Sequence, residues 1–193
     1  MDAYEALERL AAGNRRYVTE KYAKTDIGVK KRAELTKGQE PFAIILGCSD
    51  SRIPPEIVFD QGLGQLFVVR TAGQVVDDVV LGSIEYAVEH LDVRLILVLG
   101  HQDCGAVKAA LENKQGPMHI ASILQSIAPA VETAKKNRTG ELLLNAIKSN
   151  IEITVEKLQS TSPILKKAIM RKGLQIIGAI HNICDGSVTL DYT

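Results

Sequence analysis

The chain has few cysteines, no excess of charge of either sign and no long hydrophobic run. Only 3 of its 193 residues are cysteines, fewer than a disulfide framework would use, so metal binding or catalysis is favoured over cross-linking. Lysine plus arginine and aspartate plus glutamate balance at 23 each. The net charge therefore indicates neither a nucleic-acid partner nor an anionic membrane surface, and small neutral substrates remain open.

The apolar runs at residues 43–46 and 95–99 are far shorter than a bilayer-spanning segment. The first residues are charged and amphipathic, unlike a signal peptide. We therefore expect a cytoplasmic protein with no membrane partner. A hydrophobic content of 46% is enough for one domain over residues 1–193 with a sizeable core.

The hydrophobic pattern predicts an α/β fold with a central, mostly parallel sheet flanked by helices. Residues 42–47, 65–70 and 94–100 are short aliphatic runs bounded by glycine, which is typical of strands buried on both faces. Between the last two, residues 77–91 carry apolar side chains at helical spacing. Strand, helix and strand in this order indicate parallel pairing.

The two ends of the chain carry further elements. An amphipathic helix is predicted over residues 2–20, as part of an N-terminal helical arm of about residues 1–36. A closing strand pair is predicted at 173–180 and 187–190, with Asp185 and Gly186 in the turn. The remaining helical patterns cover 104–113, about 118–136, and a long stretch from 141 that Pro163 should interrupt or kink.

Cys48 and the pair of His101 and Cys104 each follow directly after a predicted strand. Parallel neighbours end at the same edge of a sheet, so these side chains can enter one coordination sphere. Zinc favours thiolate and imidazole ligands, and three protein ligands with one open position are typical of a catalytic site. The sequence therefore predicts one zinc ion (Zn2+) per chain, held by Cys48, His101 and Cys104.

Asp50 and Arg52 follow Cys48 in the run CSDSR. Alternation along an extended segment sends both side chains to one side, where the guanidinium can hold the carboxylate ionised and oriented. Asp50 either supplies a fourth bond to the metal or stays off it and accepts a hydrogen bond from zinc-bound water. Arg52 favours the second alternative, which makes Asp50 and Arg52 the predicted catalytic residues.

Each of these residues alone has an ordinary structural interpretation. A single cysteine at a strand end is usually a small buried hydrophobic residue, and Asp50 with Arg52 alone would be a surface ion pair. The combination of both motifs at strand ends is what indicates a site. The other residues with possible chemistry are interpreted as a structural thiol, Cys184, and as surface or packing histidines, His90, His119 and His181.

The two motifs, CSDSR at 48–52 and GHQDCG at 100–105, resemble the signatures of the β-class carbonic anhydrases in order and spacing. Three further segments are similar to the family: LERLAAGNRRYV at 7–18, LFVVRTAG at 66–73 and LGSIEYAVEHL at 81–91. The resemblance extends over roughly the whole chain.

The resemblance implies a zinc enzyme that reversibly hydrates carbon dioxide to bicarbonate and a proton, by attack of zinc-bound hydroxide. It implies the same zinc ligands and the same catalytic pair. The residues that align with the carbon dioxide pocket of plant-type members are Gln39, Phe67, Ala72 and Tyr86. In the family this pocket lies at a dimer interface. The resemblance thus implies a homodimer or dimer of dimers, with Gln39 reaching across and the N-terminal helix packed on the neighbour.

The chain also departs from the family. Thr71 and Gln74 stand where asparagine is common. Some bacterial members close the site by moving the aspartate onto zinc, linked to bicarbonate in a tryptophan-containing pocket. This chain has no tryptophan, and Ile45 occupies the aligned position, so we expect the open form. Because two thiolates cancel the charge of zinc, we also expect activity to rise on the alkaline side of pH 7.

Three other functions stay open on the sequence alone. A sister enzyme that hydrolyses carbon disulfide or carbonyl sulfide would keep the same zinc ligands. A non-catalytic zinc-binding interaction module would leave Asp50 and Arg52 without a role. A thiol enzyme would use Cys104 as nucleophile and His101 as base, although no CxxC motif supports redox chemistry.

Overall fold

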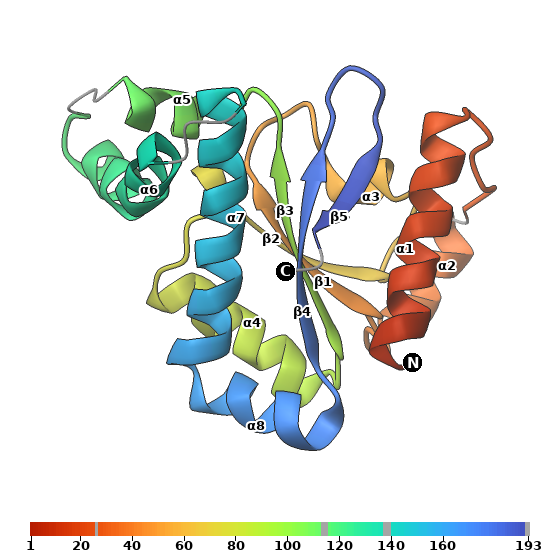
Figure 1. The fold of residues 1–193 in the computed structure, drawn as a ribbon. Helices are drawn as coiled ribbons and strands as arrows, with labels where there is room; N and C mark the ends of the chain where they lie inside the picture. The colour runs from red at the N-terminus through yellow and green to blue at the C-terminus, as the bar shows by residue number, and fades with distance from the viewer. Residues whose placement is uncertain (26, 113–115, 137–139, 192–193) are drawn as a thin grey trace.

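A five-stranded sheet with the order β2-β1-β3-β4-β5 forms the centre of the molecule (Figure 1). The computed structural model describes residues 1–25, 27–112, 116–136 and 140–191. The strands are β1 Ala43–Cys48, β2 Leu66–Thr71, β3 Leu95–His101, β4 Gln175–His181 and β5 Val188–Asp191. All neighbours pair in parallel except β4 and β5, which are antiparallel. The predicted fold class and the C-terminal strand pair are confirmed.

Helices lie on both sides of this sheet, with α4, α6, α7 and α8 on one side and α1, α2 and α3 on the other (Figure 1). Their bounds are α1 Ala3–Val18, α2 Val29–Leu35, α3 Pro55–Val58, α4 Asp78–His90, α5 Gly105–Leu111, α6 His119–Lys136, α7 Leu142–Thr161 and α8 Pro163–Lys172, with a 3-10 turn η1 at Ala72–Gln74. Residue 113, the end of one predicted helix, lies outside the described residues. Over the described ranges, no helix is long and apolar enough to cross a membrane.

The two central strands are buried along their whole length, as their continuous aliphatic runs predict. Ile44 and Leu46 of β1 face the core under α4 and α7, whereas Ile45 and Leu97 face the core under α1. Each such side chain contributes about 1.5–3 kcal/mol through burial, so β1 and β3 are firmly held. This core therefore fixes the position of the residues at the carboxyl ends of β1 and β3.

Helix α1 packs on the sheet of its own chain, although the resemblance led us to expect it on a neighbour. Its buried residues include Leu7 and Leu10, which contact the β1 and β3 side chains of that face. Asn14 fixes the helix further, because its Nδ2 donates to Val58 O at 3.0 Å and its Oδ1 accepts from Val188 N at 2.9 Å. Buried polar groups need such partners, and these lie within the same chain.

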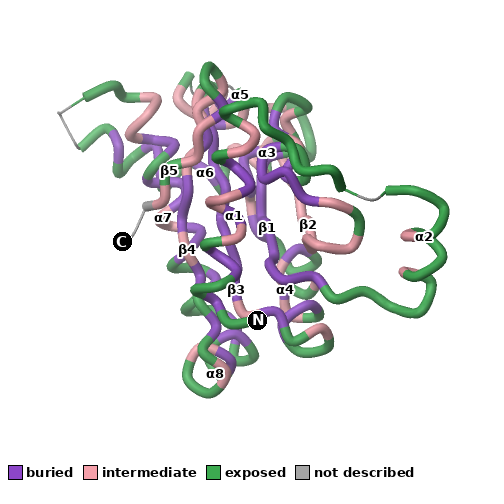
Figure 2. The backbone as a smooth tube through the Cα atoms, turned by 90° about the vertical axis from the view of Figure 1, so that its right-hand side faces the viewer, coloured by how far each residue is buried: buried purple, intermediate pink, exposed green. Residues whose placement is uncertain are grey.

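The segment that contains α2 behaves differently from α1. No residue of α2 is buried, and Figure 2 shows this helix projecting from the body of the molecule, with most of its residues exposed. The predicted arm of residues 1–36 therefore has two parts, a helix packed on the sheet and a projecting second half.

Pro163 separates two helices, as predicted, but it does so by beginning the second one. Helix α7 ends at Thr161, and the Ser162 hydroxyl accepts a hydrogen bond from Leu165 N at 3.0 Å. Proline is tolerated in a first helical turn because it needs no hydrogen-bond partner for its nitrogen there. The result is a new helix, α8, rather than a kink in α7.

Candidate metal centre

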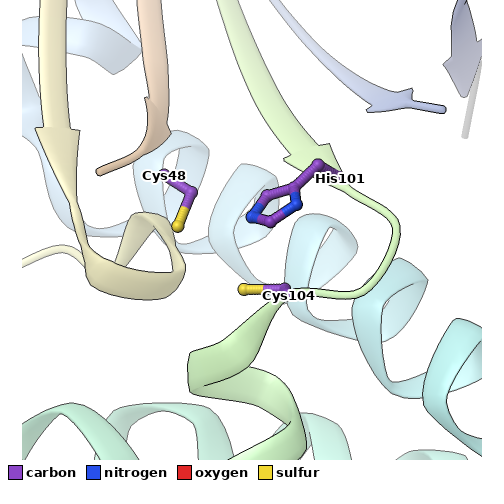
Figure 3. A group of neighbouring side chains, drawn as sticks. All are labelled: Cys48, His101 and Cys104. Carbon is purple, nitrogen blue, oxygen red and sulfur yellow. The ribbon is translucent and has the colours of Figure 1, made fainter. Parts of the chain in front are cut away.

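The carboxyl ends of β1 and β3 bring Cys48 and His101 together. Cys48 is the last residue of β1 and His101 the last of β3, and the two strands are hydrogen-bonded neighbours. Cys104 joins them from the residue that precedes α5. The three ligand atoms lie within 4.8 Å of one another, all three residues are buried, and Figure 3 shows their side chains converging. Within the described part of the chain this is the one such group of three.

His101 has one unprotonated ring nitrogen, Nε2, which faces the two sulfur atoms. Its Nδ1 lies 2.8 Å from the carbonyl oxygen of Gln102, and a carbonyl only accepts, so Nδ1 carries the ring proton. Nε2 is buried and has no hydrogen-bond partner among the described residues. An unpartnered buried lone pair is costly, and a bound cation would satisfy it.

Contact between the two thiols moves their pKa values in opposite directions. The Cys104 thiol beside it lowers the pKa of Cys48 to about 4, against the effect of burial. The same contact, together with burial, raises the pKa of Cys104, although the backbone amides of Val107 and Ala106 oppose this. Two thiolates in contact repel each other unless a cation lies between them. A divalent metal would allow both to ionise.

Two backbone interactions hold Cys48 in place. The backbone amide of Gly73 donates to Cys48 Sγ at 3.3 Å, and the side chain of Asn150 donates through Nδ2 to Gly73 O at 3.0 Å. On the other side, Arg70 donates through Nε to Cys48 O at 2.8 Å and through Nη2 to Asp50 O at 2.6 Å. Our sequence reasoning missed these three residues. Of the three, Asn150 could have been noticed in the sequence, because it is a polar residue on the apolar stripe of α7.

Asp50 and Arg52 form a closed pair beside the cluster. Arg52 Nε lies 2.9 Å from Asp50 Oδ1 and Arg52 Nη2 lies 2.8 Å from Oδ2, while the backbone amide of Arg52 donates to Oδ1 at 3.0 Å. This bidentate contact holds the pKa of the Asp50 carboxyl well below its usual range. The carboxylate is not one of the converging ligand atoms, so it stands beside the cluster as an ionised acceptor.

Of the four predicted pocket residues, Ala72 alone stands next to the cluster, as the neighbour of Gly73 in η1. Thr71 is the register partner of Cys48, and Phe67 lies four residues before Thr71 on β2. Phe67 is therefore about 13 Å from Cys48 along the strand direction. Gln39 lies with Phe42 and Gln65 near the amino ends of the strands, before β1 begins. The length of β1, about 16 Å, therefore separates Gln39 from Cys48.

Tyr86, the fourth, lies on α4 with an exposed ring that packs 4.9 Å from the ring of His90. Tyr86 is near the end of α4, which leads to the start of β3, whereas the cluster lies at the end of β3. Gln39, Phe67 and Tyr86 therefore stand apart from the cluster of their own chain. Cys184 is exposed in the turn between β4 and β5, outside the group of three.

The donor set fits zinc. Two cysteine sulfurs and one imidazole nitrogen are soft to borderline ligands, and a zinc ion held by these three would keep a further position for a solvent or substrate oxygen. The buried, unpartnered Nε2 of His101 and the two contacting thiols both favour a cation at the point where they converge.

Comparison with known proteins agrees with this geometry. The family model described as carbonic anhydrase matches residues 43–188. The chain is 41% identical to a carbonic anhydrase of Mycolicibacterium smegmatis over 192 residues, covering 96% of this chain and 91% of the relative. It is also 41% identical, with the same coverages, to carbonic anhydrase 2 of Mycobacterium tuberculosis.

Solved structures show the same likeness. A structure from work on two tetrameric β-carbonic anhydrases of Sordaria macrospora aligns with a TM-score of 0.78 and 27% identity, covering 84% of this chain and 86% of that one. A Coccomyxa β-carbonic anhydrase in complex with acetazolamide aligns with a TM-score of 0.75 and 27% identity, covering 95% and 85%. The chain belongs to the β-class carbonic anhydrase family.

Proposed function

We propose that this protein binds one zinc ion through Cys48, His101 and Cys104 and catalyses the reversible hydration of carbon dioxide to bicarbonate and a proton. The observation that carries the proposal is the convergence of three buried ligand atoms within 4.8 Å of one another, with His101 Nε2 bare. Zinc in such a site supplies a Lewis acid that makes water nucleophilic near neutral pH.

The protein groups around the cluster orient the reaction. Asp50 is ionised, so it can only accept hydrogen bonds and favours a reacting group that presents an O–H to it. Arg52 fixes the direction of the two carboxylate oxygens, and Arg70 fixes the backbone from which they project. This pre-set acceptor is the reason to propose Asp50 and Arg52 as catalytic residues rather than as a surface ion pair.

We further propose that a second copy of the chain completes the site. Strand β2 is at the edge of the sheet and is half-buried along its whole length, whereas β1 and β3 are fully buried. Next to it, α4 exposes Val79 and Tyr86. A neighbour packed on this edge would cover apolar surface and could supply Gln39, Phe67 and Tyr86, which are far from the cluster of their own chain. A homodimer or dimer of dimers meets this requirement.

Stopped-flow hydration of carbon dioxide by the zinc-loaded protein tests the proposal. We expect turnover by the wild type, with Asp50→Asn strongly impaired. Asp92→Asn is the matched control, because Asp92 also pairs with an arginine two residues on, at 3.0 Å, but far from the cluster. Turnover of carbon disulfide or carbonyl sulfide without hydration of carbon dioxide would point to the sister hydrolase. Tight zinc binding with no turnover would point to a non-catalytic module.

A further inference from the structure

Asn150 is a polar residue at a buried position of α7, where apolar residues are usual. It lies on the face of α7 that packs against the sheet, between Ile147 and Ile151, and is 4% exposed. An amide buried among aliphatic side chains is costly unless it is hydrogen-bonded. Its Nδ2 donates to the carbonyl oxygen of Gly73 at 3.0 Å, across 77 positions of sequence.

The acceptor of this bond is next to the cluster. Gly73 has φ +66°, a left-handed conformation, and a Cβ at this position would lie 2.7 Å from Ile127 Cδ1. The left-handed backbone therefore favours glycine, and any larger residue would also have to displace the Ile127 side chain. In this conformation the amide of Gly73 points at Cys48 Sγ, 3.3 Å away. One glycine thus connects the side chain of Asn150 to a sulfur of the cluster.

We propose that Asn150 is a positioning residue for the Cys48 thiolate, acting through the backbone of Gly73. The inference rests on the proposed function, since it assumes that Cys48 binds zinc. By holding the Gly73 carbonyl, the amide of Asn150 keeps the left-handed turn from relaxing and so keeps the Gly73 N–H directed at sulfur. A hydrogen bond to a thiolate withdraws charge from it and fixes its direction, which tunes both metal affinity and the metal's Lewis acidity.

Asn150→Leu tests this role, because leucine has a similar size and cannot donate. The matched control is Thr154→Val, one turn further along the same helix. The Thr154 hydroxyl donates to the backbone carbonyl of Asn150 at 2.7 Å and is buried, but it has no bond to Gly73. Both variants lose one buried hydrogen bond of α7, so both are expected to unfold at lower temperature.

The two variants should differ in their metal readouts. We expect Asn150→Leu to weaken zinc binding about tenfold in a chelator competition and to shift the sulfur-to-cobalt charge-transfer band of the cobalt(II)-loaded protein. Thr154→Val should leave both unchanged. If Asn150→Leu keeps the zinc affinity and the cobalt band of the wild type, Asn150 is a packing residue and the proposal is wrong.

A measurement on the wild type does not depend on any variant folding. In protein loaded with cadmium-113, the Gly73 amide proton should show a scalar coupling to the metal through Cys48 Sγ. Absence of this coupling in a cadmium-loaded sample contradicts the proposal. Failure of the protein to bind zinc or cadmium at all would instead contradict the proposed function, so the two failures are distinguishable.

Discussion

Arg52 makes three hydrogen bonds to the carboxylate of Asp50, two from its guanidinium at 2.9 and 2.8 Å and one from its backbone amide at 3.0 Å. Because the two residues are only two positions apart, these bonds fix the conformation of the loop that follows β1, beside the cluster. The Asp50 side chain is 18% exposed and that of Arg52 is 50% exposed. The carboxylate is thus the better shielded partner and has a fixed direction.

Removing either partner of this pair should reduce activity without removing the metal. We expect Asp50→Asn and Arg52→Lys to lower kcat/KM for carbon dioxide by about 100-fold and about 10-fold respectively, since lysine cannot reproduce the bidentate contact. Zinc content should stay at the wild-type value in both, because neither residue is a proposed ligand. Loss of zinc along with activity would show that the pair supports the cluster rather than the reaction.

The hydration rate should rise between pH 6 and 9, and Asp50 should not be the group responsible. Because Arg52 holds the pKa of Asp50 well below its usual range, this carboxyl stays ionised throughout the interval. Arg52→Lys weakens that contact and moves the pKa of Asp50 up toward its ordinary value near 4, still below the interval. A stopped-flow pH series should therefore show the same inflection in both proteins. A flat wild-type profile would contradict this account.

His181 should make the protein less stable in acid. It ends β4 in register with His101, is buried, and neither of its ring nitrogens has a partner among the described residues. Burial, together with the nearby His101, lowers the pKa of His181 to about 4, although Asp185 opposes this. Between pH 6.5 and 4 the unfolded chain then binds a proton that the folded chain does not. The free energy of unfolding should fall over this interval by up to about 3 kcal/mol.

His181→Phe has a ring of similar size that does not titrate. In denaturant unfolding at pH 7, 5.5 and 4.5, its stability should decline less than that of the wild type, and the difference should grow as the pH falls. Parallel declines in the two proteins would show that His181 does not contribute to the acid sensitivity.

Two inactive variants should restore activity when mixed. Gln39→Ala leaves the cluster intact, and Cys104→Ser leaves Gln39 intact. After subunit exchange we expect about a quarter of the wild-type activity, since half of the dimers are mixed and each of these has one complete site. The control is Gln39→Ala mixed with a double variant that carries both changes, which should gain nothing. Activity of the first mixture equal to the sum of its parts would place Gln39 outside the neighbour's site.

The parts of the fold and site that follow from local pattern were predictable. The composition of the aliphatic runs that form β1 and β3 indicates buried strands. Parallel pairing of these strands brings their carboxyl ends to the same end of the sheet. Cys48, His101 and Cys104 stand at or just after those ends, so their convergence could be expected from the sequence.

Features that depend on packing between distant segments were not predictable. The bond from Asn150 to Gly73 joins residues 77 positions apart, and no local pattern pairs them. The placement of α1 on its own sheet depends on the packing of Leu7 and Leu10 and on Asn14, whose partners come from distant parts of the chain. His181 was interpreted as a surface or packing residue, and only its surroundings show that it is buried.

The central claim is that one zinc ion is bound by two sulfurs and one imidazole nitrogen, with one position left for an oxygen. Zinc K-edge X-ray absorption on purified protein of known metal content tests it most directly. The account predicts about one zinc per chain, with two sulfur and two lighter scatterers at the distances of a tetrahedral site. A protein without stoichiometric zinc, or a zinc with no sulfur neighbours, would contradict it.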